Sequence, residues 1–244
     1  SARHGCLHLM KCLYRSGRTN INVRSYGFLG PPLVIAMQFN HRHIVFFLLQ
    51  LKELKIDCPD IEGNTAAMFL FNSGFSDLKY INFFISSGVN LYQLNNNGET
   101  LLFAAVRSGN INVIQYLLEK KIIIQIINYK NKDGTSSLME AIKADRYDIV
   151  ELLLSVHGID VISTDLNGYT PFALAAFYNR PDIMKLLSLL DNTQYYLSKV
   201  NKDGNTPFLI AVKNRHIKVI DYLIQNHLFE NDFNHQNNDG NSGL

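Results

Sequence analysis

The sequence of 244 residues predicts an all-α solenoid of stacked helix–turn–helix units with short β-turn or hairpin fingers between them. Three observations carry this prediction. A glycine recurs at a near-constant period, a helix-start signal follows it, and an apolar helical stripe comes next. The glycines stand at positions 63, 98, 134, 168, 204 and 240, which are 35, 36, 34, 36 and 36 residues apart. Such a period indicates repeated units rather than one globular core.

Each unit opens with a turn and a helix start, best seen in Asp203-Gly204-Asn205-Thr206-Pro207. We expect the glycine to adopt positive φ and the Asp or Asn before it to bond its own backbone. The Thr206 hydroxyl can cap a helix, and Pro207 at the first helical position lacks an N–H that would have no partner there. The pattern therefore predicts a short helix beginning at each such site. Small residues such as Ala175-Ala176 then let neighbouring helices approach closely.

A second helix is expected after a break of the type Arg107-Ser108-Gly109-Asn110. Its signal is an apolar spacing of one, three and one residues, which lines one helical face. This spacing occurs at Val113, Ile114, Leu117, Leu118; at Ile44, Val45, Leu48, Leu49; at Ile149, Val150, Leu153, Leu154; and at Val219, Ile220, Leu223, Ile224. Each unit is thus predicted as turn, helix, loop, helix.

With these elements the unit resembles an ankyrin repeat, whose period is about 33 residues and whose signature is Thr-Pro-Leu-His-x-Ala. The resemblance covers essentially residues 1–244, as one domain with five complete, one divergent and two truncated units. The expected bounds are 1–25 (partial), 26–59, 60–94, 95–130, 131–164, 165–200, 201–236 and 237–244 (partial). We expect extra residues at Gly27–Leu33 and around Phe75-Ser76-Asp77, and Ala66 replaces the proline of its unit. Truncated units at both ends predict a fragment of a longer ankyrin-repeat chain.

One departure from the family is systematic, because no unit carries the histidine of the signature. Its place is taken by Val34, Met68, Phe103, Met139, Ala173 and Leu209. The hydrogen bonds of that histidine to neighbouring backbone are therefore replaced by apolar packing, and the stack depends more on van der Waals fit.

Composition excludes several classes of function. A formal charge of +2 is too small for a generic polyanion binder, so no nucleic acid partner is expected. The apolar runs are far shorter than the roughly 20 residues of a membrane span. Three cysteines form an odd set rather than a disulfide framework, and no Asn-x-Ser/Thr site occurs. These features predict a cytoplasmic location, with the nucleus as a second possibility.

Enzymatic and metal chemistry are not predicted within this sequence. Gly-x-Ser-x-Gly, glycine-rich phosphate loops and local cysteine-nucleophile signatures are all absent, so we expect no catalytic residues and no cofactor. His4, His8 and Cys12 lie four apart and would share a helical face fit for a soft metal, but we favour Leu9 and Cys12 as core and both histidines as surface. The Ile122–Ile127 run could form an exposed strand. Where the resemblance places it, an extended segment buried between units is favoured.

The resemblance implies a binding surface on the concave face, made of the turn tips and the exposed side of each first helix. The sixth unit is distinctive there, since Tyr169, Phe177 and Tyr178 supply aromatic side chains where the family varies freely. We expect a hot spot with a basic rim that binds a protein segment with apolar anchors and acidic neighbours. The alternative, that these rings only pack against the next repeat, stays open. The candidate residues are Tyr169, Phe177, Tyr178, Leu166, Lys132, Lys143, Lys202, Lys213 and Arg107.

These observations favour a non-catalytic scaffold for protein or peptide partners, with the oligomeric state left open. An alternative is the targeting arm of a larger enzyme or secreted effector whose catalytic part lies outside residues 1–244. A structural spacer without any partner is a third possibility.

Overall fold

The computed structural model describes residues 2–17, 20–23, 30–70, 77–190, 195, 197–228 and 235–242. The chain forms two compact units, Ser1–Ile126 and Ile127–Leu244, and each is described by itself. Within the described residues every regular element is helical, and the only β pairing is an isolated antiparallel bridge between Lys130 and Ser136. The predicted all-α class with turn fingers is confirmed. The assignment of residues 1–244 to one domain stays a prediction.

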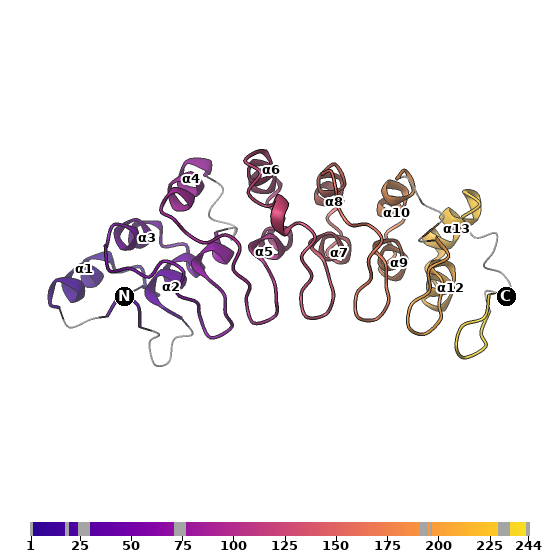
Figure 1. Cartoon of the computed structure of the whole chain (residues 1–244), viewed down its shortest axis with the longest axis horizontal. Helices are drawn as coiled ribbons and strands as arrows, with labels where there is room; N and C mark the ends of the chain where they lie inside the picture. Colours follow the sequence, from indigo (N-terminus) through magenta and orange to yellow (C-terminus); the bar gives the residue numbers. More distant parts are fainter. Residues whose placement is uncertain are drawn as a thin grey trace. The chain divides into compact units, whose positions relative to one another are not determined.

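The first compact unit holds helices α1 to α6 and two short 3₁₀ helices (Figure 1). Helix α2 packs on α3, α5 packs on α6, and η1 contacts both α2 and α5. Helix α1 contacts α3. The bounds are α1 Leu7–Arg15, α2 Pro32–Gln38, α3 Arg42–Leu49, η1 Ala66–Phe69, α4 Leu78–Ser86, α5 Leu101–Ser108, α6 Ile111–Glu119 and η2 Ile124–Ile126.

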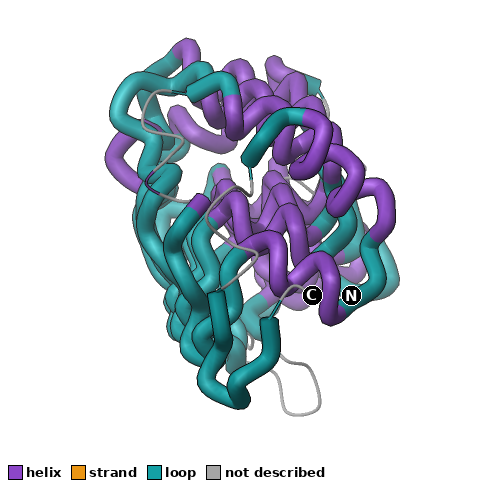
Figure 2. The backbone as a smooth tube through the Cα atoms, turned by 90° about the vertical axis from the view of Figure 1, so that its right-hand side faces the viewer, coloured by secondary structure: helices purple, strands orange, loops and turns teal. Residues whose placement is uncertain are grey.

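In its described residues the second compact unit contains three pairs of helices. The first helices form one layer, in which α9 contacts both α7 and α12, and the second helices α8, α10 and α13 form another (Figure 1). Within this unit the fingers extend from the first-helix layer on the side away from the second helices (Figure 1), and Figure 2 draws loops of this kind in teal. The bounds are α7 Ser137–Lys143, α8 Tyr147–Leu154, α9 Pro171–Phe177, α10 Pro181–Ser188, α12 Pro207–Lys213 and α13 Ile217–Gln225.

The helix starts follow the predicted chemistry. Thr206 Oγ1 accepts a hydrogen bond from the Leu209 N–H at 3.3 Å, and Thr170 Oγ1 accepts one from the Ala173 N–H at 3.1 Å. A proline occupies the first helical position in α9 and α12. The third repeat differs, because η1 is a 3₁₀ helix of four residues and Thr65 gives it no side-chain cap. Proline and a working cap are both missing there, so the helix start is less well specified.

The core follows the predicted apolar spacing only in part. The fourth position is half-buried at Leu49, Leu118 and Leu154, and in α13 Ile220 is half-buried and Ile224 is 41% exposed. Val113, Ile114 and Leu117 of α6 are buried, and the equivalent three positions of α3 and α8 are buried as well. The six residues that replace the family histidine are also buried, so apolar packing fills those positions as expected. Another histidine joins neighbouring repeats instead, since His216 Nδ1 lies 2.9 Å from the Ala176 carbonyl oxygen.

Each finger is held by one side-chain oxygen that accepts two backbone hydrogen bonds. In the sixth repeat Asp165 Oδ1 accepts the N–H groups of Asn167 and Tyr169, both at 2.9 Å. The accepting residue stands three positions before the glycine. We predicted that the Asp or Asn directly before the glycine would bond its own backbone, and that prediction was wrong. A side chain at that earlier position spans both limbs of the turn. The six accepting residues are Asp60, Asn95, Asn131, Asp165, Asn201 and Asn237.

The recurring glycine serves the neighbouring finger as well as its own turn. Gly168 has φ +83°, and a Cβ built on it would lie 2.9 Å from the backbone nitrogen of Lys202. The Lys202 N–H donates to the Asn167 carbonyl oxygen at 2.9 Å, so the two fingers are joined by main chain. Only glycine permits both the positive φ and this close approach.

Some expectations differ from the structure or lie outside its described residues. The Ile122–Ile127 run contains the 3₁₀ helix η2 rather than an extended segment. Its residues Ile123, Ile126 and Ile127 are buried, which supports packing over an exposed strand. The extra residues expected at 27–29 and 75–76 fall outside the described residues.

Candidate partner-binding surface

The sixth repeat positions its candidate residues through α9 and the finger before it. Thr170 and Pro171 fix the start of α9, so Phe177 ends the helix two turns later and Tyr178 caps it. Ala175 and Ala176 are buried, and these small side chains allow α9 to contact α7 and α12 closely. The finger carries Tyr169 directly before the cap. The rings therefore stand on elements whose backbone is fixed on both sides.

The three aromatic rings meet in the structure. The ring centroids of Tyr169 and Phe177 are 5.4 Å apart at an interplanar angle of 69°, and those of Phe177 and Tyr178 are 5.0 Å apart at 74°. Both pairs are edge-to-face, which is the favoured arrangement of aromatic quadrupoles. Phe177 remains 37% exposed, and Tyr169 and Tyr178 are half-buried. The predicted aromatic cluster is thus one continuous surface, which we call the aromatic triad.

A cavity of about 290 Å³ opens beside the aromatic triad. Two of the predicted lysines, Lys143 and Lys202, line it together with two carboxylates, Asp165 and Asp203. Its remaining walls are the aromatic triad, Leu174 and Asn167. The charge around the cavity is mixed rather than basic. Leu174 and Asp165 carry no separate sequence signal for this role, because one reads as core and the other as a turn former.

The surroundings of the cavity change the pKa of the Tyr169 phenol. Burial raises its pKa above the ordinary tyrosine value, a hydrogen bond with Asn201 opposes the rise, and the negative charges of Asp203 and Asp165 add to it. A raised pKa means that the neutral phenol is favoured in the folded protein.

Four other candidates lie outside this cavity or are already engaged. Leu166, at the tip of its finger, is 57% exposed, and its N–H donates to the Asp133 carbonyl oxygen at 2.9 Å. Lys132 and Lys213 are exposed and are not part of the cavity wall. Arg107 belongs to the first compact unit.

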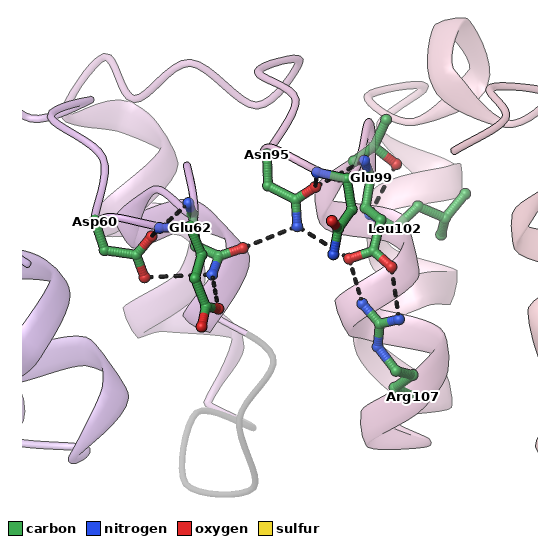
Figure 3. Close-up of polar contacts among 9 residues, drawn as sticks. Asp60, Glu62, Asn95, Glu99, Leu102 and Arg107 are labelled. Carbon is green, nitrogen blue, oxygen red and sulfur yellow. Dashed lines mark hydrogen bonds and ion pairs between the residues drawn. The ribbon is translucent and has the colours of Figure 1, made fainter. Parts of the chain in front are cut away.

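Arg107 is held by an ion pair within its own repeat (Figure 3). Its two terminal nitrogens donate to Glu99 Oε1 at 2.9 Å and Oε2 at 2.7 Å. Glu99 Oε2 also accepts a bond from Asn95 Nδ2 at 3.0 Å, and the same amide nitrogen donates to Asn64 Oδ1 at 2.9 Å. The hydrogen bond from Arg107 lowers the pKa of Glu99 against the opposing effect of burial. Arg107 is therefore paired within its own repeat, and its part in binding stays a prediction.

Comparison with known proteins identifies the repeat. A family model described as ankyrin repeats, three copies, matches residues 73–165, 121–196 and 157–239. The chain belongs to the ankyrin repeat family. A putative ankyrin repeat protein of Rickettsia bellii (strain RML369-C) is 26% identical over 145 residues, which are 59% of this chain and 78% of that protein.

Two further ankyrin relatives are much longer than the matched region. The human 2-5A-dependent ribonuclease is 40% identical over 77 residues, which are 31% of this chain and 10% of the ribonuclease. Putative ankyrin repeat protein L371 of Acanthamoeba polyphaga mimivirus is 25% identical over 203 residues, which are 79% of this chain and 25% of that protein. Ankyrin repeats are general protein–protein interaction modules, and this is the function that family membership supports.

The candidate metal ligands of the first ankyrin repeat do not share a helical face. Helix α1 begins at Leu7, so His4 lies before it, and only His8 Nε2 and Cys12 Sγ approach each other, at 3.6 Å. In the parts of the chain that the structure describes, no three His, Cys, Asp or Glu side chains are grouped to hold a metal. The expectation that Leu9 and Cys12 are core was wrong, since both are exposed.

The exposure of Leu9 has a simple reason in the repeat. The equivalent position in α6, Val113, is covered by α5, the first helix of the same repeat. Helix α1 follows no such helix within residues 2–17.

Within the described chain, no helix has both the length and the apolar character needed to cross a bilayer.

Proposed function

We propose that this chain is a non-catalytic scaffold that binds a protein or peptide partner through the finger side of the second compact unit. We assign this surface to the concave face that the family resemblance predicts for binding. The observation that carries the proposal is the aromatic triad beside its cavity. Tyrosine and phenylalanine held on rigid elements supply large contact area at low entropic cost, which is typical of binding hot spots.

The surface combines an apolar anchor site with charges at its edge. Leu166 and the aromatic triad supply the apolar part. The side chains of Lys132, Lys202 and Lys213 are exposed, and Lys202 lines the cavity. Charged groups at the rim of an interface set orientation and association rate more than affinity. We therefore assign the affinity to the triad and a steering role to the lysines.

The test is binding by the double variant Phe177→Ala, Tyr178→Ala in the full chain. Peptides selected from a random library on the wild-type chain serve as the partner. If both rings are anchors, binding weakens by about 2 kcal/mol or more. Phe83→Ala is the matched control, because Phe83 has the same 37% exposure and a similar ring contact, 5.0 Å from Phe46. Equal affinity of a folded double variant and wild type would exclude this surface.

A second candidate is a targeting arm of a larger enzyme. The observation in its favour is the match to the human 2-5A-dependent ribonuclease, where the similar region is only 10% of the protein. Sequence on either side of residues 1–244 separates the two functions, since a catalytic motif there supports the arm. A spacer is separated from both by the peptide selection, because it predicts no peptide that depends on Phe177 and Tyr178.

We also propose a cytoplasmic location, with the nucleus as the alternative. The support is that Cys6, Cys12 and Cys58 are all free, which suits a reducing compartment. A fluorescent fusion of the full-length protein in its source cell tests this, and a secreted fusion would contradict it.

A further inference from the structure

We propose that the cavity beside the aromatic triad takes a basic side chain, lysine or arginine, of the partner segment. This inference rests on the proposed function and specifies the residue that the surface recognises. The cavity of about 290 Å³ lies near the lower limit of roughly 300 Å³ for small-molecule sites, so it suits one long side chain better than a free ligand.

The walls favour a cation over an anion. Tyr169, Phe177 and Tyr178 all line the cavity, and aromatic rings attract ammonium and guanidinium groups through their quadrupole. The long apolar stem of lysine or arginine can lie along the same rings and along Leu174. An anion gains nothing from the ring faces.

Two carboxylates, Asp165 and Asp203, line the cavity and could pair with a cation. Asp165 is held in place because its Oδ1 accepts two backbone hydrogen bonds, each of 2.9 Å. Asp203 lies on the next finger, and its carboxylate has no hydrogen bond to the described residues. Both aspartates contribute to the raised pKa of Tyr169, and no lysine is among its causes. The two carboxylates therefore lie near enough to the Tyr169 phenol to act on it.

Two lysines also line the cavity, so its formal charge is balanced. Lys143 Nζ donates to Thr135 Oγ1 at 2.9 Å, on the finger of its own repeat, and keeps its positive charge. Lys202 is exposed, and its long side chain can turn to solvent or to an acidic neighbour of the incoming residue. A basic anchor can pair with Asp165 or Asp203, and an acidic residue beside it can pair with Lys202.

Random-peptide selection on the full wild-type chain tests the inference. Peptides that lose binding to the Phe177→Ala, Tyr178→Ala variant define the set that uses the triad. We expect this set to share a lysine or arginine whose replacement by glutamine weakens binding several-fold. A triad-dependent set without a shared basic residue overturns the inference and leaves the proposed function standing. If no peptide depends on the triad, both fail.

Removing one negative charge from the cavity lining gives a second test, in which the affinity for the same peptides is measured. Asp203→Asn should weaken binding about two- to fivefold, the range of an exposed ion pair. Asp133→Asn is the matched control, because Asp133 also precedes a finger glycine but does not line the cavity. Unchanged or tighter binding by Asp203→Asn overturns the basic anchor. An equal loss in both variants also overturns it, because the effect would not come from the cavity.

Discussion

The fourth and sixth ankyrin repeats use the same two positions in opposite ways. One position ends the finger and the other lies eight residues later, at the end of the first helix. In the fourth repeat they hold Glu99 and Arg107, which form a two-point ion pair. In the sixth they hold Tyr169 and Phe177, whose rings stand edge to face beside an open cavity. In the fourth repeat each side chain of the pair is the hydrogen-bond partner of the other, whereas in the sixth repeat the pair leaves apolar surface exposed.

The fifth repeat is intermediate and supports this comparison. Its equivalent pair is Thr135 and Lys143, joined by one hydrogen bond of 2.9 Å. A finger and a first helix therefore contact each other at this place whether the side chains are charged, polar or aromatic. The scaffold fixes the position, and the side chains decide whether it is closed or available to a partner.

The largest effect is expected from the finger that carries Tyr169. Gly168→Ala places a Cβ 2.9 Å from the Lys202 backbone and also forces alanine to φ +83°. Gly88→Ala is the control, since Gly88 has the same φ but nothing within 4 Å of its Cβ. The φ penalty alone is about 1–2 kcal/mol, and overpacking adds roughly 1–3 kcal/mol for Gly168→Ala. Urea unfolding measures both, and equal losses would show that the fingers are not in close contact.

Replacing Tyr169 and Phe177 of the sixth repeat by the Glu and Arg of the fourth repeat should weaken peptide binding. Tyr169→Glu with Phe177→Arg replaces the rings by the pair that closes on itself in the fourth repeat. Peptides that depend on the triad should then bind more weakly by about 2 kcal/mol. The converse variant, Glu99→Tyr with Arg107→Phe, leaves the triad intact and should bind them normally. Titration calorimetry on variants checked by circular dichroism decides, and retained affinity of the first variant would contradict the comparison.

The sequence was sufficient for features that depend on local pattern. Thr206 and Pro207 predict a helix start, and the spacing of Val113, Ile114 and Leu117 predicts a buried helix face. Helix capping and helical periodicity both act within one repeat, so the local sequence is enough to predict them. These patterns recur, so each repeat tests the prediction made from the others. The third repeat forms only a 3₁₀ helix, and there both the proline and the side-chain cap are missing, whereas α5 and α7 start without proline but keep a cap.

The surface was only partly predictable, because its contacts cross between elements. Glu99 and Arg107 are eight residues apart across a turn, a spacing that neither helix nor strand periodicity brings together. Asp165 reads as a turn former, and its place in the cavity wall depends on how the next finger lies against it. The meeting of the three rings could be predicted because Tyr169, Phe177 and Tyr178 occupy surface positions of one repeat, whereas their use in binding stays a prediction.

Breaking the Glu99–Arg107 ion pair of the fourth repeat should lower the free energy of unfolding by a moderate amount that depends on pH. Arg107→Ala leaves Glu99, whose side chain is only 12% exposed, without its main partner. Arg107 itself is 46% exposed, so solvent screening limits the loss of stability to about 1 kcal/mol. Because the folded-state pKa of Glu99 is lowered, this stabilisation is present above the unfolded carboxyl pKa of about 4.3 and is lost as the pH falls through the lowered value.

Unfolding free energies of wild type and Arg107→Ala should therefore converge in acid. Lys143→Ala is the control at the equivalent position, because Lys143 bonds a neutral hydroxyl and its loss adds no acidic pH dependence through its partner. A constant difference between wild type and Arg107→Ala down to low pH would show that the ion pair is not the source of the stabilisation.

The smallest effect concerns the hydroxyl of Tyr169. Tyr169→Phe keeps the ring pair and should change stability by less than about 0.5 kcal/mol at neutral pH. The folded-state pKa of Tyr169 is raised, so the folded protein retains this proton longer than the unfolded chain, and stability is lost as the pH rises above about 10. Wild type should lose stability more steeply than Tyr169→Phe in that range. Tyr80→Phe is a positive control, because burial raises the pKa of Tyr80 more strongly. Superimposable alkaline curves for wild type and Tyr169→Phe would mean that the phenol is open to solvent and that the aspartates do not act on it.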